Sequence, residues 1–133
     1  MSAFESNVVT RQVRDARELQ QALELVHENY VRCGYMEPAA SGLRIHKHYA
    51  LPSTRTFVAT LRDQVISTVS LFFDSKLKLP LDDLYGDKLD PFRKAGLRIV
   101  EVGMLADRRE ALTRGLDMVL RLMKHAFWEA ASQ

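Results

Sequence analysis

The sequence predicts an α/β protein of the α+β layer type, in which a central sheet is flanked by helices. Strand-like and helix-like segments follow one another along the chain, and one strand-like segment is apolar on both of its faces. Such an order is typical of layered folds, in which helices cover a sheet. The 133 residues, 47% of them hydrophobic, can bury one core without disulfides or metals. We therefore expect a single domain over residues 1–133.

The first predicted elements are a strand and a helix. Residues 8–13 favour a short strand, and Asp15 occupies a helix N-cap position, where a carboxylate accepts hydrogen bonds from free amides. Gly34 is expected to end the helix. Between these two residues, apolar side chains recur every three or four positions and predict one helical face, formed by Leu19, Leu23, Val26, Tyr30 and Cys33.

Residues 36–53 have no clear period and predict a long connection. Long loops in compact domains are often functional, whereas charged runs are more often solvated surface. The basic and aromatic residues of this segment therefore either line a site or form a solvated face, and the second interpretation is favoured. These residues are Arg44, His46, Lys47, His48 and Tyr49.

Two strands, residues 56–61 and 65–73, are predicted to form a hairpin with a turn at residues 62–64. In the second strand, alternate residues from Val65 to Phe73 should share one face, and alternate residues from Ile66 to Phe72 the other. Both faces carry apolar residues, so we expect this strand to be covered on both sides.

The last part of the chain predicts an excursion, a strand and a helix. Residues 79–92 form the excursion, with a short helix, and Gly96 breaks it. Residues 99–105 predict a strand on which Val100, Val102 and Met104 share one face. A strong helix is expected from Ala111, because apolar residues recur at helical spacing at Leu112, Leu116, Val119, Met123 and Phe127.

Glu101 is the first candidate for catalysis. It lies in the middle of the strand of residues 99–105, among apolar neighbours, where a charge is costly unless it is paired. An environment that raises its proton affinity would suit a general base. The alternative, about equally favoured, is a structural carboxylate paired with an arginine such as Arg98 or Arg55.

The residues after Glu101 are a second candidate. Gly103 has no side chain and allows close approach of a ligand, and an irregular strand at Met104 and Leu105 would free amides to polarise a carbonyl group. Alternatively, Gly103 only relieves crowding. Asp74 follows the central strand, where it can hold a substrate amine, orient Arg55 or, more commonly, only terminate the strand.

Composition and spacing exclude several classes of protein. The net charge is only +2 and is spread along the chain, which argues against nucleic-acid binding. The single cysteine, Cys33, cannot form an internal disulfide, and no apolar run is long enough for a membrane span. The N-terminus lacks a signal-peptide pattern, so we expect a cytoplasmic protein. The four histidines show no recognisable metal-binding spacing.

Five segments, taken in order, carry a family resemblance: ENYVRCGY at 28–35, TRTFVA at 54–59, LFFDS at 71–75, LPLD at 79–82 and IVEVGMLA at 99–106. This set resembles the N-acyl amino acid synthases, GNAT-fold acyltransferases related to the acyl-homoserine lactone synthases. The resemblance implies a GNAT-like mixed central sheet. It also implies transfer of a long-chain acyl group from an acyl carrier protein thioester to the α-amine of an amino acid, without a tightly bound cofactor or a metal.

The resemblance also implies roles for particular residues. Glu101 would be the catalytic base, and Gly103, Met104 and Leu105 would bind the acyl donor and its oxyanion. The remaining residues, Arg55, Asp74 and Tyr35, would contact the amino acid substrate.

Two departures from the family pattern keep other functions open. Residues 106–112 lack the glycines of a pyrophosphate loop, which favours acyl carrier protein over coenzyme A as the donor. The closing C-terminal elements of the GNAT fold are not found, so we expect a truncated domain whose open strand edge favours a homodimer. The alternatives are an acyl-homoserine lactone synthase-like enzyme, an acetyl-CoA-dependent GNAT acetyltransferase and an inactive interaction module.

Overall fold

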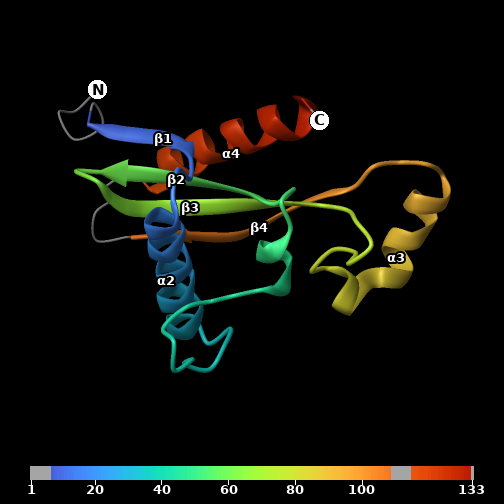
Figure 1. The fold of residues 1–133 in the computed structure, drawn as a ribbon, viewed down its shortest axis with the longest axis horizontal. Coiled ribbons are helices and arrows are strands. Elements are labelled where there is room, and N and C mark those ends of the chain that lie inside the picture. The colour runs from blue at the N-terminus through green and yellow to red at the C-terminus, as the bar shows by residue number, and fades with distance from the viewer. Residues whose placement is uncertain (1–6, 109–114, 133) are drawn as a thin grey trace.

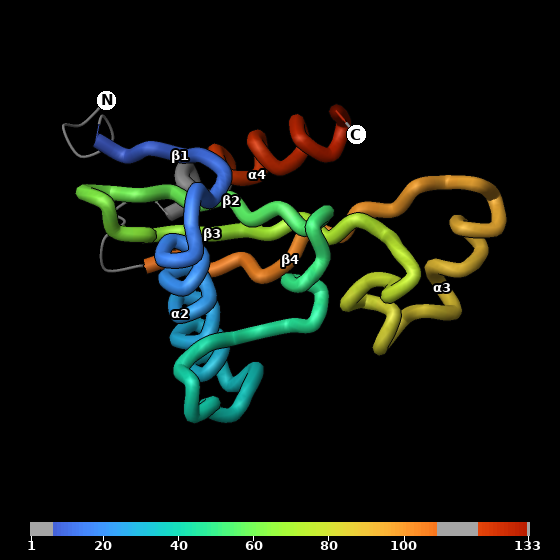
Figure 2. Tube along the Cα trace, in the orientation of Figure 1, coloured from blue at the N-terminus to red at the C-terminus, as the bar shows by residue number. Residues whose placement is uncertain are grey.

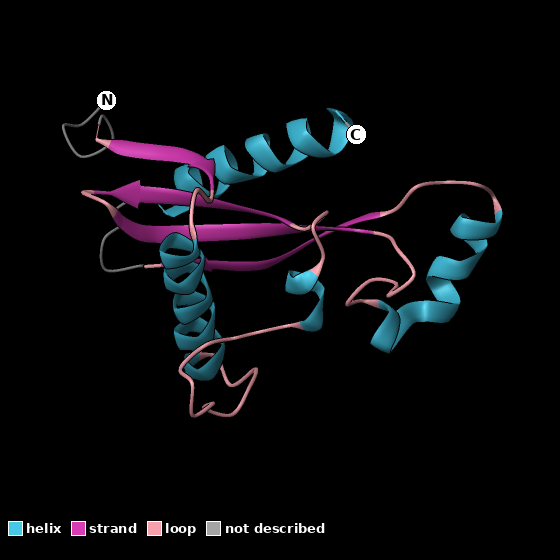
Figure 3. Ribbon diagram, viewed as in Figure 1, coloured by secondary structure: helices cyan, strands magenta, loops and turns pink. Residues whose placement is uncertain are grey.

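A computed structural model describes residues 7–108 and 115–132 of the chain as four strands, three α-helices and one 3-10 helix (Figure 1, Figure 3). The strands are β1 (Val8–Gln12), β2 (Arg55–Leu61), β3 (Gln64–Phe73) and β4 (Val100–Asp107). The helices are α2 (Ala16–Arg32), η1 (Lys47–Ala50), α3 (Asp82–Lys94) and α4 (Gly115–Ser132). The predicted start of the last helix, at Ala111, lies outside the described residues.

The four strands form one sheet in the order β1-β2-β3-β4, and the three pairings among them are antiparallel (Figure 2). One apolar cluster joins α2 to the sheet and a second joins α4 to it, so each helix covers a different face. The predicted layer arrangement is therefore confirmed, including the coverage of β3 on both sides. Helix α3 projects beyond the ends of β3 and β4 (Figure 1).

Helix α2 begins and ends where the sequence predicts. The Asp15 side chain accepts a hydrogen bond from the Glu18 amide at 2.9 Å, as an N-cap residue does. At the other end, Gly34 has a φ of +75°, and the Tyr35 amide donates to the Tyr30 carbonyl at 2.8 Å. A left-handed residue that closes the last turn in this way favours glycine.

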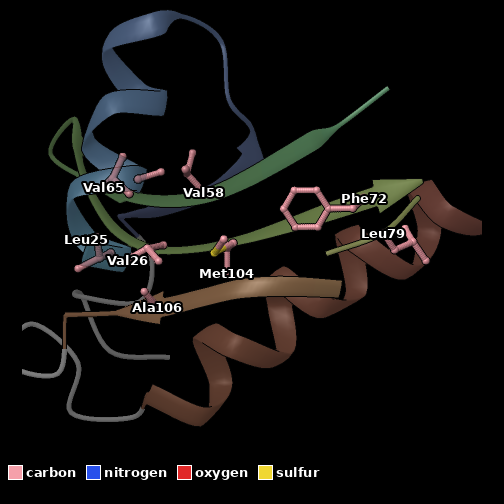
Figure 4. Close-up of a cluster of buried hydrophobic side chains, with 9 residues drawn as sticks. Leu25, Val26, Val58, Val65, Phe72, Leu79, Met104 and Ala106 are labelled. Atoms are coloured by element: carbon pink, nitrogen blue, oxygen red, sulfur yellow. The ribbon is translucent and has the colours of Figure 1, made fainter. Parts of the chain in front are cut away.

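The cluster under α2 extends along β3 and β4 (Figure 4). Leu25 and Val26 lie at one end of the cluster, Phe72 and Leu79 at the other, and Met104 between them. Burial of aliphatic and aromatic side chains of this size contributes roughly 1.5–3 kcal/mol each to folding. This cluster therefore fixes the position of β4, the strand that carries Glu101.

Helix α4 packs through small residues as well as large ones. Leu122 and Ala126 are fully buried against the other face of the sheet, where Phe57 and Leu71 lie. The predicted stripe is only partly correct, because Met123 packs against this cluster whereas Phe127 is mostly exposed. The helix thus faces the sheet with its alanine-containing side. Among the described residues, no helix is long and apolar enough to cross a membrane.

Two β-bulges alter the predicted alternation of side chains. Ala59 and Thr60 are consecutive on β2, but their partners on β3 are Ser67 and Val65, so Ile66 is an extra residue in β3. Val65 therefore packs on the α2 side and Ile66 on the α4 side, where Val69 also lies. The predicted faces hold from Ser67 to Phe73 and are wrong before that, because an extra residue in one strand inverts the alternation beyond it.

Candidate active site

Glu101 lies on β4 directly opposite Phe72, on the α2 side of the sheet. Its side chain is half-buried, and its Oε1 accepts a hydrogen bond of 2.8 Å from the Leu81 amide. Burial raises the pKa of this carboxyl, while the Leu81 amide and the nearby His48 oppose the rise. A carboxylate with raised proton affinity is the property expected of a general base at neutral pH.

The structural alternative for Glu101 is wrong for both arginines that it names. Arg55 Nε lies 3.8 Å from Glu129 on α4, and Arg55 Nη1 donates to the Pro52 carbonyl at 2.6 Å. Arg98 lines a cavity on the other side of the strand end. Within the described residues no guanidinium pairs with Glu101.

The irregular strand expected after Glu101 is present. The register of β3 with β4 skips Met104 and Leu105 on β4 but only Val69 on β3, which defines a second bulge. Met104 has a φ of +54°, a left-handed conformation that a side chain rarely adopts. Backbone strain of this kind is concentrated at functional sites.

This bulge also corrects the predicted faces of β4. Val100 and Val102 share one face as predicted, on the α4 side, but Met104 is buried in the cluster under α2. Leu105 is left substantially exposed at the edge of the sheet. A Cβ added at Gly103 would lie 3.7 Å from the Phe72 ring, an ordinary contact, so crowding does not require a glycine there.

Asp74 is held by an arginine of α3. Arg93 donates from Nε to Asp74 Oδ2 at 2.6 Å and from Nη2 to Asp74 Oδ1 at 3.0 Å. The same guanidinium binds Asp82 and Asp90, and it lowers the pKa of Asp82 to about 2. Asp82 and Asp90 lie on α3 itself, so it is the Arg93–Asp74 pair that ties the otherwise exposed α3 to the end of β3.

Arg55 and Asp74 meet in one cavity of about 500 Å³ at the ends of the central strands. Apolar side chains of Phe73, Leu97 and Val100 complete the cavity, and Arg98 adds a second guanidinium. The structure thus brings together two of the three residues predicted to bind substrate. The third, Tyr35, is 75% exposed after the end of α2, contacts the Tyr30 ring, and does not line this cavity.

The loop before β2 contributes residues that the sequence did not assign to the site. His48 is only 1% exposed, and the His48 and Tyr49 rings pack edge-on against Phe72, the residue opposite Glu101. The favoured interpretation of a solvated face is therefore wrong for these two residues, although Lys47 is exposed. Arg44 Nε is buried without a hydrogen-bond partner among the described residues.

The comparison with protein families identifies the chain. The N-acyl amino acid synthase FeeM family matches residues 21–132, most of the chain. The chain belongs to this family. The solved structure of FeeM, an N-acyl amino acid synthase from uncultured soil microbes, superposes with a TM-score of 0.77 at 22% identity. At this identity the structural likeness shows a shared fold.

The match with FeeM covers 94% of this chain and 65% of the FeeM chain. The chain therefore spans less than two thirds of the length of that family member. No curated protein matches the chain. In the described residues there is no group of three or more histidine, cysteine, aspartate or glutamate side chains placed to hold a metal ion.

Proposed function

We propose that this chain carries the catalytic base of an N-acyltransferase, which moves a long-chain fatty acyl group from a carrier thioester to the α-amine of an amino acid. Membership of the N-acyl amino acid synthase family supports the reaction class. The single observation that carries the assignment is Glu101, a half-buried carboxylate in mid-strand that binds one backbone amide and, within the described residues, no cation.

The reaction needs a base because an amino acid at neutral pH carries an ammonium group, which has no lone pair. Glu101 takes one proton from this ammonium, and the resulting amine attacks the thioester carbonyl carbon. A C–N bond forms, the C–S bond breaks, and the second amine proton leaves with the carrier thiolate. Glu101 Oε2, which accepts no hydrogen bond from the described residues, is the oxygen suited to receive the proton.

The bulge on β4 is suited to the oxyanion that forms during attack. Met104 and Leu105 lie three and four positions after Glu101, and they have no partners in the β3 register. Amides turned out of a ladder can donate to a developing negative charge, and one such donor is typically worth 10²–10³ in rate. Gly103, which has no side chain, leaves space for the substrate between Glu101 and the bulge.

The cavity at the strand ends is suited to the amino acid acceptor. Its two guanidinium groups, Arg55 and Arg98, can pair with a carboxylate of the acceptor. Glu101 is on the α2 side of the sheet and does not line this cavity, so we assign the cavity to acceptor binding and not to deprotonation of the ammonium group. Both oxygens of Asp74 already accept from Arg93, so we assign the larger share of binding to Arg55. A contact of Tyr35 with the substrate stays a prediction from the family resemblance alone.

We further propose acyl carrier protein as the donor and the cytoplasm as the location. The absence of glycine from residues 106–112 supports a carrier protein over coenzyme A, since diphosphate loops depend on close-approaching backbone amides. Neither a tightly bound cofactor nor a metal is needed for the chemistry above. Among the described residues β4 lies at the end of the strand order, and an edge strand of this kind supports pairing with a second copy.

The test is an assay of the purified chain with long-chain acyl carrier protein and a pool of amino acids, read by mass spectrometry. We expect one or a few N-acyl amino acids and less product when acyl-CoA replaces the carrier. Acylation of S-adenosylmethionine would indicate a homoserine lactone synthase activity instead. A folded chain that forms no acylated product with any donor would contradict the proposal.

A further inference from the structure

His48 is a fully buried titratable side chain for which the proposed reaction has no role. It lies in η1, and its ring stacks on that of His46 with the centroids 4.6 Å apart. Both ring nitrogens are engaged: Nδ1 lies 2.6 Å from His46 Nδ1, and Nε2 lies 2.9 Å from the Lys78 carbonyl oxygen. A buried imidazole with two fixed partners has one ring orientation.

The proton positions follow from the partners. A carbonyl oxygen only accepts, so His48 Nε2 carries a hydrogen and donates to Lys78. The two Nδ1 atoms lie within hydrogen-bond distance of each other, and the backbone amide of His48 donates to His46 Nδ1 at 3.4 Å. His46 therefore holds the His48 ring in the orientation that donates to Lys78.

The Lys78 carbonyl begins a short path to Glu101. Lys78 has a φ of +60°, and the next residue, Leu79, is buried in the cluster under α2. Two residues further on, the Leu81 amide donates to Glu101 Oε1. The His48 hydrogen bond and the burial of Leu79 thus fix the segment whose amide holds the carboxylate of the proposed base.

The same region is ringed by charged groups. His48, and Asp82 and Asp83 at the start of α3, are close enough to Glu101 to act on it electrostatically. From the loop, Arg44 and Lys47 act on His46, as does Asp83. Charges of both signs surround the pair, so a displaced Glu101 carboxylate would meet different neighbours and a different proton affinity.

We propose that His48 is a positioning residue for Glu101. His48 acts through the Lys78 carbonyl and the Leu81 amide, and His46 orients the His48 ring. The catalytic consequence rests on the proposed function, whereas the link from His48 to Glu101 does not. The link can be observed by NMR without any turnover, so the two ideas fail separately.

The first experiment uses the wild-type chain with ¹⁵N and ¹³C labels. The Leu81 amide proton shift should follow the titration of the Glu101 carboxyl carbon, because the bond weakens when Glu101 takes a proton. The His48 Nε2 proton should exchange slowly with solvent. A Leu81 amide that does not respond to the Glu101 titration would overturn the proposal, even if no His48 variant folds.

The second experiment compares His48→Leu with His48→Gln. Leucine has no donor, so Leu81 should loosen its hold on Glu101, and the loss of an amide that favours the charged form moves the Glu101 titration to higher pH. The acidic limb of the kcat/KM profile should move in the same direction, with a rate loss of roughly 10- to 100-fold at neutral pH. Glutamine keeps an N–H near the position of Nε2 and should restore most of both losses.

The matched control is His125→Gln, which removes another hydrogen-bonded imidazole, bound to Thr10 on β1. It should leave both the titration and the rate unchanged. A folded His48→Leu variant with an unmoved Glu101 titration would overturn the proposal, as would a His48→Gln variant as impaired as His48→Leu. An intact NMR link in a chain without activity would support the positioning and contradict the proposed function.

Discussion

The two faces of the sheet are built from different kinds of residue. The face under α4 is almost entirely apolar where it is buried, with Phe57, Val69 and Leu71 against Leu122. The face under α2 also has an apolar cluster, but buried polar side chains lie along it, namely Thr56, Thr68, Ser70, His48 and Tyr49, together with the half-buried Glu101.

This difference separates stability from chemistry. Buried polar groups cost free energy unless every one of them is hydrogen-bonded. The hydroxyl of Ser70 meets this need by binding both Tyr49 and Thr56 at 3.0 Å, and Thr68 donates to the Phe57 carbonyl at 2.9 Å. A satisfied polar network beside Glu101 indicates that the α2 face positions the proposed base, while the buried part of the α4 face, away from the cavity that contains Arg55, holds the sheet together.

Leu122→Ala on the α4 face should have the largest effect, and the effect should be on stability. The side chain is fully buried, so its truncation leaves a cavity and should lower the free energy of unfolding by about 2–5 kcal/mol. Chemical denaturation measures the loss. Below the unfolding transition the rate per folded molecule should equal that of the wild type, and a selective loss of activity would break the division between the faces.

Arg55→Met tests whether the cavity on the α4 side of the sheet binds the acceptor. Loss of a guanidinium that binds the acceptor carboxylate in ground state and transition state alike should raise KM for the amino acid about tenfold and change kcat little. Steady-state kinetics with varied amino acid provides the measurement. Arg17→Met, an exposed arginine on α2, is the control. A fall in kcat at constant KM would instead place Arg55 in the chemical step.

Glu18→Gln should have the smallest effect, and only in acid. Arg11 binds both oxygens of Glu18 and, with the Arg14 amide, lowers the pKa of this carboxyl from 4.5 to about 2. A depressed carboxyl pKa stabilises the fold above the unfolded value and loses that contribution as pH falls from 4.5 towards 2. Because Arg11 is partly exposed, the loss should be about 1 kcal/mol.

Denaturation between pH 6 and pH 2 tests this expectation. As pH decreases, the free energy of unfolding should fall less steeply in Glu18→Gln than in the wild type. An identical pH dependence in both proteins would mean that the pair at the start of α2 does not contribute to acid stability. The catalytic rate at neutral pH should be the same in both, because the hydrogen bonds and ion pairs of Glu18 are with Arg11, Arg14 and Asp15 and not with the residues around Glu101.

Much of the fold could be predicted from the sequence because its signals are local. The N-cap at Asp15, the left-handed Gly34 and the hairpin of β2 with β3 each depend on neighbouring residues, and each was correctly predicted. The positions of the bulges could not be predicted from neighbouring residues. A bulge depends on the partner strand, and strict alternation along one strand places Val65 and Met104 on the wrong face.

The same distinction between local signals and long-range contacts applies to the candidate site. Glu101 could be singled out because a carboxylate among apolar strand residues is unusual in any context. The burial of His48 could not, since it comes from contacts with Phe72 and Lys78, which lie 24 and 30 positions away. Long-range packing of this kind has no local signature, and a basic loop is usually solvated.

The measurement that tests the central claim most directly is the rate of Glu101→Gln. The glutamine oxygen can still accept from the Leu81 amide, so the substitution removes basicity and leaves the hydrogen bond in place. We predict a rate lower by about two orders of magnitude or more at neutral pH, the scale of a lost general base. The deficit should narrow as pH rises and free amine forms without help, whereas a rate equal to that of the wild type at neutral pH would contradict the account.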